Sequence, residues 1–322
     1  MRFELTVLRI CNPLHWATLP PLRKLYFILI LSVCQLKWIV NKYSMFNHPP
    51  KILAHKSSLS LGNFVLPEYI LNKGNDSVNL FHRYCPHRMY PLHSVGEHVK
   101  EITCKFHNFK WSEDGTPLNN PKTLNCGTAS IGRSGLIFKN FKEPDHKWVD
   151  DLASEQNLVY SHSVQGESTG SWLWLMDAEA DLLHVYKNGI HPLLSQQINL
   201  EDIIMDQGDG WILQQHPTGW WLYIFPFTFV EYGDPGMVMV NTVIPNDYDS
   251  EYGFKWITQF YYDPSVSFDR RYLFETLDQV FKEDVATAEL QKGNYFPLMK
   301  AMNRYEDHCV HFGKWVKTNK VG

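Results

Sequence analysis

The chain has 322 residues, a formal net charge of −4 at pH 7 and 14% aromatic residues. This length allows two domains with a large core, and the mildly acidic balance gives no indication of nucleic-acid binding. The six cysteines form no disulfide framework in the sequence, so we expect a reducing, cytoplasmic environment.

Residues 1–44 differ from the rest of the chain in their sequence pattern. The apolar run Leu25–Cys34 has ten residues, whereas a bilayer span needs about 20. Pro20-Pro21 precede it and no small-x-small cleavage site follows, which disfavours a signal peptide. We therefore expect a leader that is disordered or untranslated, with translation beginning at Met45, and no membrane association.

Short strand-like runs and turns occupy residues 51–141. The clearest runs are Asn63–Pro67, Tyr69–Leu71 and Val78–Phe81, and a Gly-Asn-Asp turn at 74–76 separates the last two. Such spacing predicts a small antiparallel β-barrel or sandwich.

Two Cys–His couples follow in this region, Cys85-Pro86-His87 and Cys104-Lys105-Phe106-His107, with sixteen residues between them. Two thiolates and two imidazoles are the ligands of a mixed-ligand [2Fe–2S] cluster, in which the histidines raise the reduction potential. A Cys2His2 zinc site is the alternative. It is disfavoured because zinc fingers do not usually begin with Cys-x-His.

These motifs resemble the Rieske domain of Rieske non-haem iron oxygenases, whose pattern is CxHR followed by CxYHGWx and an aromatic residue. Asn108 stands here for the glycine, and Asn tolerates left-handed backbone better than most residues. Gly135–Phe138 is similar to the last strand of that domain. Respiratory Rieske proteins add a cysteine to each loop and a serine after the second histidine. Their absence here favours the oxygenase or ferredoxin type.

The polar stretch Lys142–Asp150 predicts a linker. We accordingly expect a Rieske domain at 45–145 and a second domain at 146–322. The second domain contains long strand-like runs rich in aromatic residues, which predict an open, curved antiparallel sheet. These runs are Leu158–Val164, Trp211–His216, Trp220–Phe229, Met237–Ile244 and Phe254–Tyr262.

The first predicted helix of the second domain is Asp177–Asn188, with Asp177 as its N-cap, Glu179 in its first turns and Gly189 as its end. Asp181 and His184 are three residues apart and share a helix face, and His191 follows the helix. Two histidines and a carboxylate suit a mononuclear Fe(II) site with open positions.

Asp181, His184 and His191 resemble the second signature of the oxygenase family, D/E-x-x-H-x4-H. Six residues separate the histidines here instead of four. On an unbroken helix they would lie about 10 Å apart along the axis, whereas a helix ending at Gly189 would let His191 fold back. His216 is the reserve ligand.

The second predicted helix is Phe268–Gln291. Asp284 falls within its apolar stripe, while Glu283 points away. A carboxylate on such a stripe needs a partner or a metal, so Asp284 is either the third iron ligand or a buried Asp paired with an Arg or hydroxyl. Glu283-Asp284 together with Glu289–Gly293 resembles the family's ED-x4-E-x-Q-x-G run.

The resemblance implies an α+β chain, in which a Rieske domain precedes a helix-grip (START/Bet v1-like) domain with an antiparallel sheet and flanking helices. It also implies a homotrimer, in which Asp181 bridges His184 and a cluster histidine of the neighbouring subunit. A reductase or ferredoxin that draws on NAD(P)H would supply electrons. The reaction would be O₂-dependent hydroxylation, dioxygenation or oxidative demethylation of a small organic substrate.

Substrate identity is not encoded in a motif, although the C-terminal motifs lean toward the family branch that handles quaternary amines or aromatic acids. We expect about half of six aromatic residues to line the substrate cavity and the rest to be core. These are Trp220, Trp221, Tyr223, Phe225, Phe227 and Phe229.

Two other classes remain open. A Rieske ferredoxin-like electron carrier with a non-catalytic second domain is suggested by the short second domain and by the six-residue gap; it would lack mononuclear iron. A membrane-attached respiratory component would require residues 1–44 to be a translated part of the protein. The chain also lacks the disulfide cysteines of that class.

Overall fold

The computed structural model describes residues 51–319 except 75–76, 140–146, 153–156, 187–189, 192–198, 218, 234–235, 247–249 and 292. All of these residues belong to one unit, Phe46–Gly322. The predicted leader, the first part of the predicted linker and the predicted helix end at Asn188-Gly189 lie outside the described residues. Among the helices that are described, none combines the length and apolarity needed to cross a bilayer.

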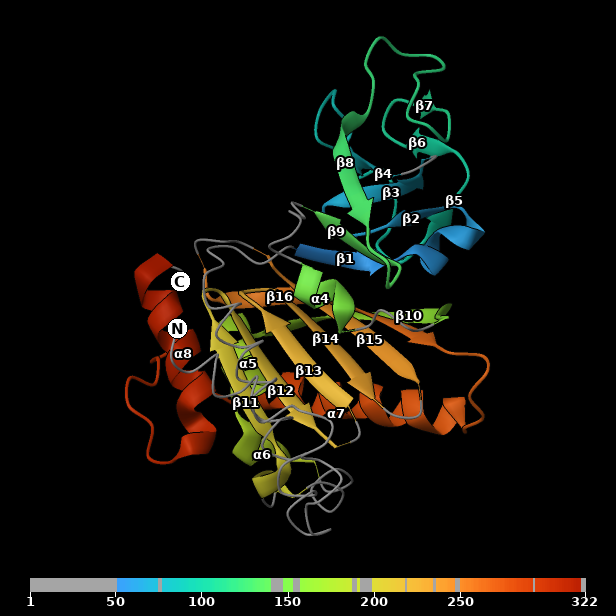
Figure 1. Ribbon diagram of the computed structural model, residues 1–322. Helices are drawn as coiled ribbons and strands as arrows, with labels where there is room; N and C mark the ends of the chain where they lie inside the picture. Colours follow the sequence, from blue (N-terminus) through green and yellow to red (C-terminus); the bar gives the residue numbers. More distant parts are fainter. Residues whose placement is uncertain are drawn as a thin grey trace, which may run out of the picture. The chain divides into compact units, whose positions relative to one another are not determined.

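The first domain is an antiparallel β-structure, as predicted (Figure 1). Its seven-stranded sheet has the order β1-β9-β8-β4-β3-β2-β5, and β6 and β7 form a separate two-stranded ribbon. The strands are β1 (Lys51–His55), β2 (Asn63–Val65), β3 (Tyr69–Lys73), β4 (Val78–His82), β5 (His98–Val99), β6 (Ile102–Cys104), β7 (Phe109–Trp111), β8 (Asn125–Ile131) and β9 (Leu136–Lys139), with the 3-10 helix η1 (Lys56–Leu61) after β1.

Both faces of this sheet are covered, because neighbouring residues of a strand point to opposite sides. Phe64 pairs with Leu71 in one core cluster, whereas Val65 pairs with Ile70 in another. The second cluster also contains Cys85, Cys104 and Trp111. The β6-β7 ribbon that carries the second Cys–His couple is therefore anchored on that face.

The second domain is built on an antiparallel sheet of seven strands in the order β10-β16-β15-β14-β13-β12-β11. These are β10 (Val159–Ser171), β11 (Ile204–Gly208), β12 (Trp211–His216), β13 (Gly219–Ile224), β14 (Thr228–Gly233), β15 (Met237–Pro245) and β16 (Tyr252–Tyr262). The single strand predicted at Trp220–Phe229 is wrong. The chain turns at Phe225-Pro226 and forms the hairpin β13-β14 instead, because proline cannot donate to a sheet ladder.

Helices cover one face of this sheet (Figure 1). The long helix α7 packs against β10 and α5, and its apolar stripe enters the largest core cluster of the domain. The helices are α4 (Lys147–Asp151), α5 (Trp172–Ala180), α6 (Leu182–Tyr186), α7 (Arg270–Leu290) and α8 (Asp307–Asn319), with 3-10 turns η2 (Leu200–Asp202) and η3 (Arg304–Glu306).

The helix predicted at Asp177–Asn188 is wrong at its start and is interrupted at Asp181, while its predicted end lies outside the described residues. Helix α5 begins earlier because the Ser171 hydroxyl caps it by accepting the Trp174 N–H. It ends at Asp181, and the chain resumes as the separate helix α6. Asp177 is consequently inside the helix, where its carboxylate accepts a hydrogen bond from the Tyr295 hydroxyl at 2.8 Å.

The second half of the predicted linker is helix α4, and it is anchored to the first domain. Asp150, which is only 3% exposed, accepts hydrogen bonds from the backbone N–H groups of Arg133 (2.6 Å) and Ser134 (2.9 Å) and from the Ser134 hydroxyl. The buried carboxylate thus holds the β8-β9 turn.

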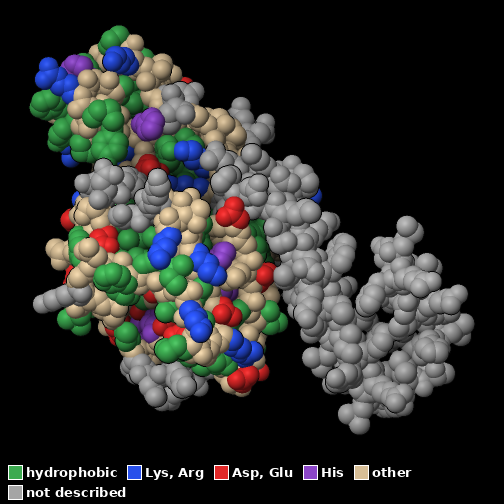
Figure 2. Space-filling view, turned by 90° about the vertical axis from the view of Figure 1, so that its left-hand side faces the viewer, with side chains coloured by type: hydrophobic (Ala, Val, Ile, Leu, Met, Phe, Trp, Pro, Cys, Tyr) green, Lys and Arg blue, Asp and Glu red, His purple; other side chains and the backbone are tan. Residues whose placement is uncertain are grey.

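Strands β1 and β16 join the two domains. The Tyr261 hydroxyl accepts the His55 backbone N–H at 3.1 Å, and the Gln259 side-chain amide donates to the Leu53 carbonyl at 3.0 Å. Ile257 packs into a core cluster of the first domain. One face of the molecule is shown in Figure 2, where Lys and Arg side chains of the described residues are interspersed with Asp and Glu.

Replacing Asp150 with Ala should lower the free energy of unfolding by about 3 kcal/mol, because three donors lose a charged, buried acceptor. Asp114→Ala is the matched control: its carboxylate also accepts from a Ser hydroxyl and a backbone N–H, but it is exposed. Urea unfolding measures both losses. Equal losses in the two variants would show that Asp150 is no anchor.

His55 predicts a pH dependence of stability. Burial lowers its pKa from 6.5 to about 4, despite the hydrogen bond to the Ser134 carbonyl. Between these values the unfolded chain binds the proton and the folded chain does not, so the free energy of unfolding falls as the pH drops. By pH 4 the loss should be about 3 kcal/mol in the wild type, and His55→Gln should lack this part. Parallel urea-unfolding profiles from pH 7 to 4 would refute the assignment.

Candidate metal centres

The first centre lies in the two loops that carry the Cys–His couples. Cys85 and Cys104 are buried, whereas His87 and His107 are exposed, with their Nδ1 atoms 3.1 Å apart. The structure thus brings the four predicted cluster residues to one end of the first domain. Two buried thiols behind two surface imidazoles fit a mixed-ligand [2Fe–2S] cluster by the chemistry of the donor set.

Two residues with left-handed backbone conformation, Met89 and Asn108, lie in these loops. Met89 has φ +53° and its N–H donates to the Cys85 carbonyl at 2.8 Å, which closes the first loop. Asn108 has φ +55°, and its carbonyl accepts the Asn119 side-chain amide at 2.9 Å. The asparagine that replaces the family glycine therefore keeps the left-handed conformation, as the sequence predicted.

Apolar side chains surround the exposed imidazoles. Tyr90 stacks on Phe106 with ring centroids 5.6 Å apart, and Met89, Phe106 and Leu118 are each more than half exposed. The surface beside the two imidazoles is therefore apolar as well as exposed.

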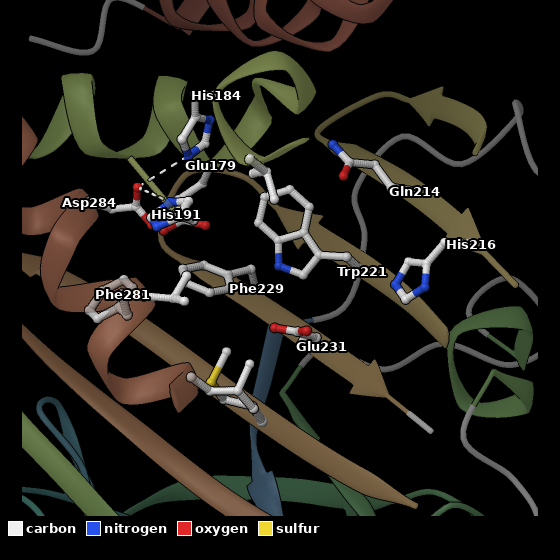
Figure 3. A pocket seen from close by; sticks show the side chains of 14 residues that line it. Glu179, His184, His191, Gln214, His216, Trp221, Phe229, Glu231, Phe281 and Asp284 are labelled. Carbon is white, nitrogen blue, oxygen red and sulfur yellow. Dashed lines mark hydrogen bonds and ion pairs between the residues drawn. The ribbon is translucent and has the colours of Figure 1, made fainter. Parts of the chain in front are cut away.

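The second centre unites His184, His191 and Asp284 (Figure 3). One oxygen of Asp284, Oδ1, lies 3.1 Å from His184 Nε2 and 2.9 Å from His191 Nε2. One ligand atom from each of the three residues lies within 4.8 Å of the others. This is the set of three that the sequence predicted, and two imidazoles with a carboxylate fit a divalent iron.

The broken helix explains how the six-residue gap is accommodated. His191 follows α6 (Leu182–Tyr186) in the chain, and the centroid of its ring lies 5.2 Å from that of the His184 ring. The sequence predicted this fold-back, and the predicted helix end at Gly189 lies outside the described residues. His216, the reserve ligand, lines the same pocket from β12 but is not part of the group of three (Figure 3).

The outer nitrogen of each histidine has its own acceptor. His184 Nδ1 donates to the Asp181 carbonyl at 2.6 Å, and His191 Nδ1 lies 2.9 Å from Glu283 Oε2. The prediction that Glu283 points away from this region is wrong, because its longer side chain reaches back from the edge of the stripe. Such acceptors fix the ring orientation and leave Nε2 free for a metal.

Asp284 is 4% exposed. Burial opposes its ionisation, but the hydrogen bonds with His184 and His191 outweigh burial and lower the pKa of the carboxyl group. For His191 burial favours the neutral ring, yet Asp284 and Glu283 together raise its pKa. The carboxylates therefore create a site that favours positive charge at the point where the ligand atoms meet.

Asp181 is at the junction of α5 and α6. Its carboxylate accepts the Leu183 N–H at 2.8 Å, and it meets His184 through its backbone carbonyl. Burial raises the pKa of its carboxyl group. The predicted bridge to a neighbouring subunit stays a prediction.

The three residues open into a pocket of about 80 Å³. Of the six aromatic residues predicted to line a cavity, Trp221 and Phe229 do so here, whereas Tyr223 and Phe225 belong to the core. The remaining pocket walls are Val185, Met239, Leu277, Val280 and Phe281, with Gln214, Glu179 and Glu231 as further polar groups.

Sequence analysis missed two of these polar residues. Glu179 was assigned to the first turns of a helix, but the helix starts earlier and the residue is buried in its last turn. Glu231 lies on β14, just past the run that was predicted to be one strand. The available signal for Glu179 was its place in the largely apolar stretch Trp172–Ala180, where Asp177 is the other charged residue.

Comparisons with known proteins agree with this arrangement. The family model of the Rieske [2Fe-2S] domain matches residues 54–131, a range that includes all four predicted cluster residues. No curated protein matches the chain. We therefore identify residues 54–131 as a Rieske [2Fe–2S] domain.

Solved structures resemble the chain over most of its length. The quaternary ammonium Rieske monooxygenase CntA in complex with L-carnitine has 18% identity and a TM-score of 0.62, covering 86% of this chain and 90% of its own. Its complex with gamma-butyrobetaine has 19% identity and a TM-score of 0.60 with the same coverage. NdmA from Pseudomonas putida CBB5 has 18% identity, a TM-score of 0.48, and coverage of 84% and 88%. The predicted fold class, a Rieske domain followed by a large antiparallel sheet with flanking helices, is confirmed.

The left-handed Asn108 gives a prediction about the cluster loop. Asn108→Val should destabilise the protein by about 1–3 kcal/mol, since a β-branched residue is strained at positive φ, whereas Asn108→Gly should not. Thermal unfolding followed by the visible absorbance of the cluster measures this. Lys105→Val controls for a β-branched residue elsewhere in the loop, and equal melting of the Gly and Val variants would contradict the prediction.

Proposed function

We propose that the chain is the oxygenase component of a Rieske-type system, which oxidises a small organic substrate with O₂. Cys85, His87, Cys104 and His107 would hold a [2Fe–2S] cluster. His184, His191 and Asp284 would hold a mononuclear Fe(II). The observation that carries the proposal is the convergence of two Nε2 atoms and one carboxylate oxygen at a pocket in the second domain.

When bound, the two metal groups supply one-electron transfer and the activation of O₂. The protein's part is to hold the metal groups, to orient their ligands and to protect the site from water. Asp284 and the two histidines leave other positions of the metal open, as O₂-using iron sites require. Glu283 and the Asp181 carbonyl fix the histidine rings, and the apolar side chains of the pocket limit access of water.

Electrons would come from a separate reductase or ferredoxin that draws on NAD(P)H. The exposed His87 and His107 with their apolar surroundings support docking of another protein surface at this end. We further propose a homotrimer in which Asp181 bridges the two centres of neighbouring subunits, and a cytoplasmic location. Hydroxylation, dioxygenation and oxidative demethylation are all compatible with this set of ligands.

Iron content tests the proposal. Anaerobically purified protein should contain about three irons and two acid-labile sulfides per chain, as a [2Fe–2S] cluster plus one mononuclear ion requires. Asp284→Ala should lose one iron and keep the visible spectrum of the cluster, because it removes the oxygen that both histidines meet. Glu275→Ala, an exposed carboxylate on the same helix, should keep all three.

The electron-carrier alternative gives a different result. If the wild type and Asp284→Ala both contain two irons per chain, the protein is an electron carrier and the oxygenase assignment is wrong.

A further inference from the structure

Two glutamates that the proposed iron site does not use line its pocket. Glu179, on α5, is 8% exposed, and its Oε1 has no hydrogen-bond partner in the described part of the chain. Glu231 faces the pocket from β14, and within the described residues its carboxylate makes no hydrogen bond or ion pair. Figure 3 shows Glu179 on the side of the pocket where His184 and His191 lie, and Glu231 below Trp221.

A carboxylate that is buried, as in Glu179, or partly buried, as in Glu231, is costly without a partner, and the surrounding protein does not relieve the cost. Among the described lining residues there is no Lys or Arg. In the iron-loaded protein the Nε2 atoms of His184 and His191 would hold the metal, and their Nδ1 atoms already have acceptors in the Asp181 carbonyl and Glu283. The two glutamates are therefore left for a ligand that carries positive charge.

The electrostatics of the pocket support this reading. Burial raises the pKa of Glu231 to about 7. Burial also raises the pKa of Glu179, and the nearby Asp284 and Glu231 raise it further. A cation bound beside the two carboxyl groups would oppose both shifts, because it favours the charged form of a carboxylate.

The aromatic wall suits the same ligand. Trp221 packs edge-to-face on Phe229 with centroids 5.7 Å apart, and both line the pocket. Indole faces attract cations and also accept aliphatic chains.

We propose that this pocket binds a protonated aliphatic amine, with its N–H groups on the carboxylates of Glu179 and Glu231 and its carbon chain on Trp221 and Phe229. This inference rests on the proposed function for the role of the amine as substrate. The unpaired acceptor on Glu179 calls for a hydrogen-bond donor. A quaternary ammonium ion, the class named for CntA, has no N–H to offer.

Calorimetric titration of the iron-loaded protein under anaerobic conditions tests the inference. The probes are n-butylammonium, butyltrimethylammonium and 1-butanol, which share a chain and differ in charge and N–H donors. Butylammonium should bind at least about tenfold more tightly than the other two, as expected for a buried charged hydrogen bond. Glu231→Gln and Glu179→Gln should each weaken it about tenfold or more.

A second readout separates a ligand site from a structural role. Because each Gln variant removes a carboxyl group that has no hydrogen-bond or ion-pair partner in the described part of the chain, its thermal stability without ligand should be equal to or higher than that of the wild type. Glu167→Gln, at an exposed position paired with Lys255, should change neither binding nor stability.

Several results would overturn the inference: equal binding of butanol, tighter binding of the quaternary ion, full affinity in both Gln variants, or no ammonium binding to protein that holds three irons. The iron content of the same samples keeps this test separate from the proposed function. Protein with two irons that still binds butylammonium through Glu231 would overturn the oxygenase assignment and leave the cation site standing.

Discussion

One carboxylate oxygen organises the second domain around its pocket. Asp284 Oδ1 is buried on α7 and is shared by His184 and His191, which belong to a different part of the chain. In a low-dielectric interior such a charge is stable only with its partners in place. The side chains of His184 on α6 and of His191 are thus held by one atom of α7, and Trp221 and Phe229 of the sheet line the same pocket.

The break between α5 and α6 makes that arrangement possible. At Asp181 the backbone leaves the helical path, and its carbonyl is then free to accept from His184 Nδ1. The same residue caps the new helix with its carboxylate. A continuous helix would engage this carbonyl within its own ladder, so the irregular residue supplies both the change of direction and the orientation of the histidine.

Sequence reasoning identified local features better than those that depend on tertiary contacts. The cluster loops were recognisable because all four residues lie in two short motifs. Asp284 was recognisable as a ligand because it is a charged residue within the apolar stripe of a helix. Glu283 was misjudged because angular position on a helix does not say how far a long side chain reaches. Glu179 and Asp177 were misjudged because Ser171 starts the helix earlier than the charged residues suggested.

The strand prediction at Trp220–Phe229 failed for a related reason. Its aromatic content is strand-like throughout, and only Pro226 marks the turn between β13 and β14. The return of His191 toward His184 was inferred from sequence as a requirement of the chemistry. Its physical basis, an ion-pair partner on a helix about ninety residues away in the chain, became visible only with the fold.

The junction of β1 and β16 has a consequence for how this architecture can evolve. Ile257 of the second domain fills part of the core around Phe64, and Gln259 satisfies the Leu53 carbonyl. A first domain cut free of the second would expose that apolar surface and leave a backbone acceptor without its partner. The first domain is therefore not a freely exchangeable module. Recombination with a different second domain would succeed only if that domain had a strand equivalent to β16, with side chains that replace Ile257 and Gln259.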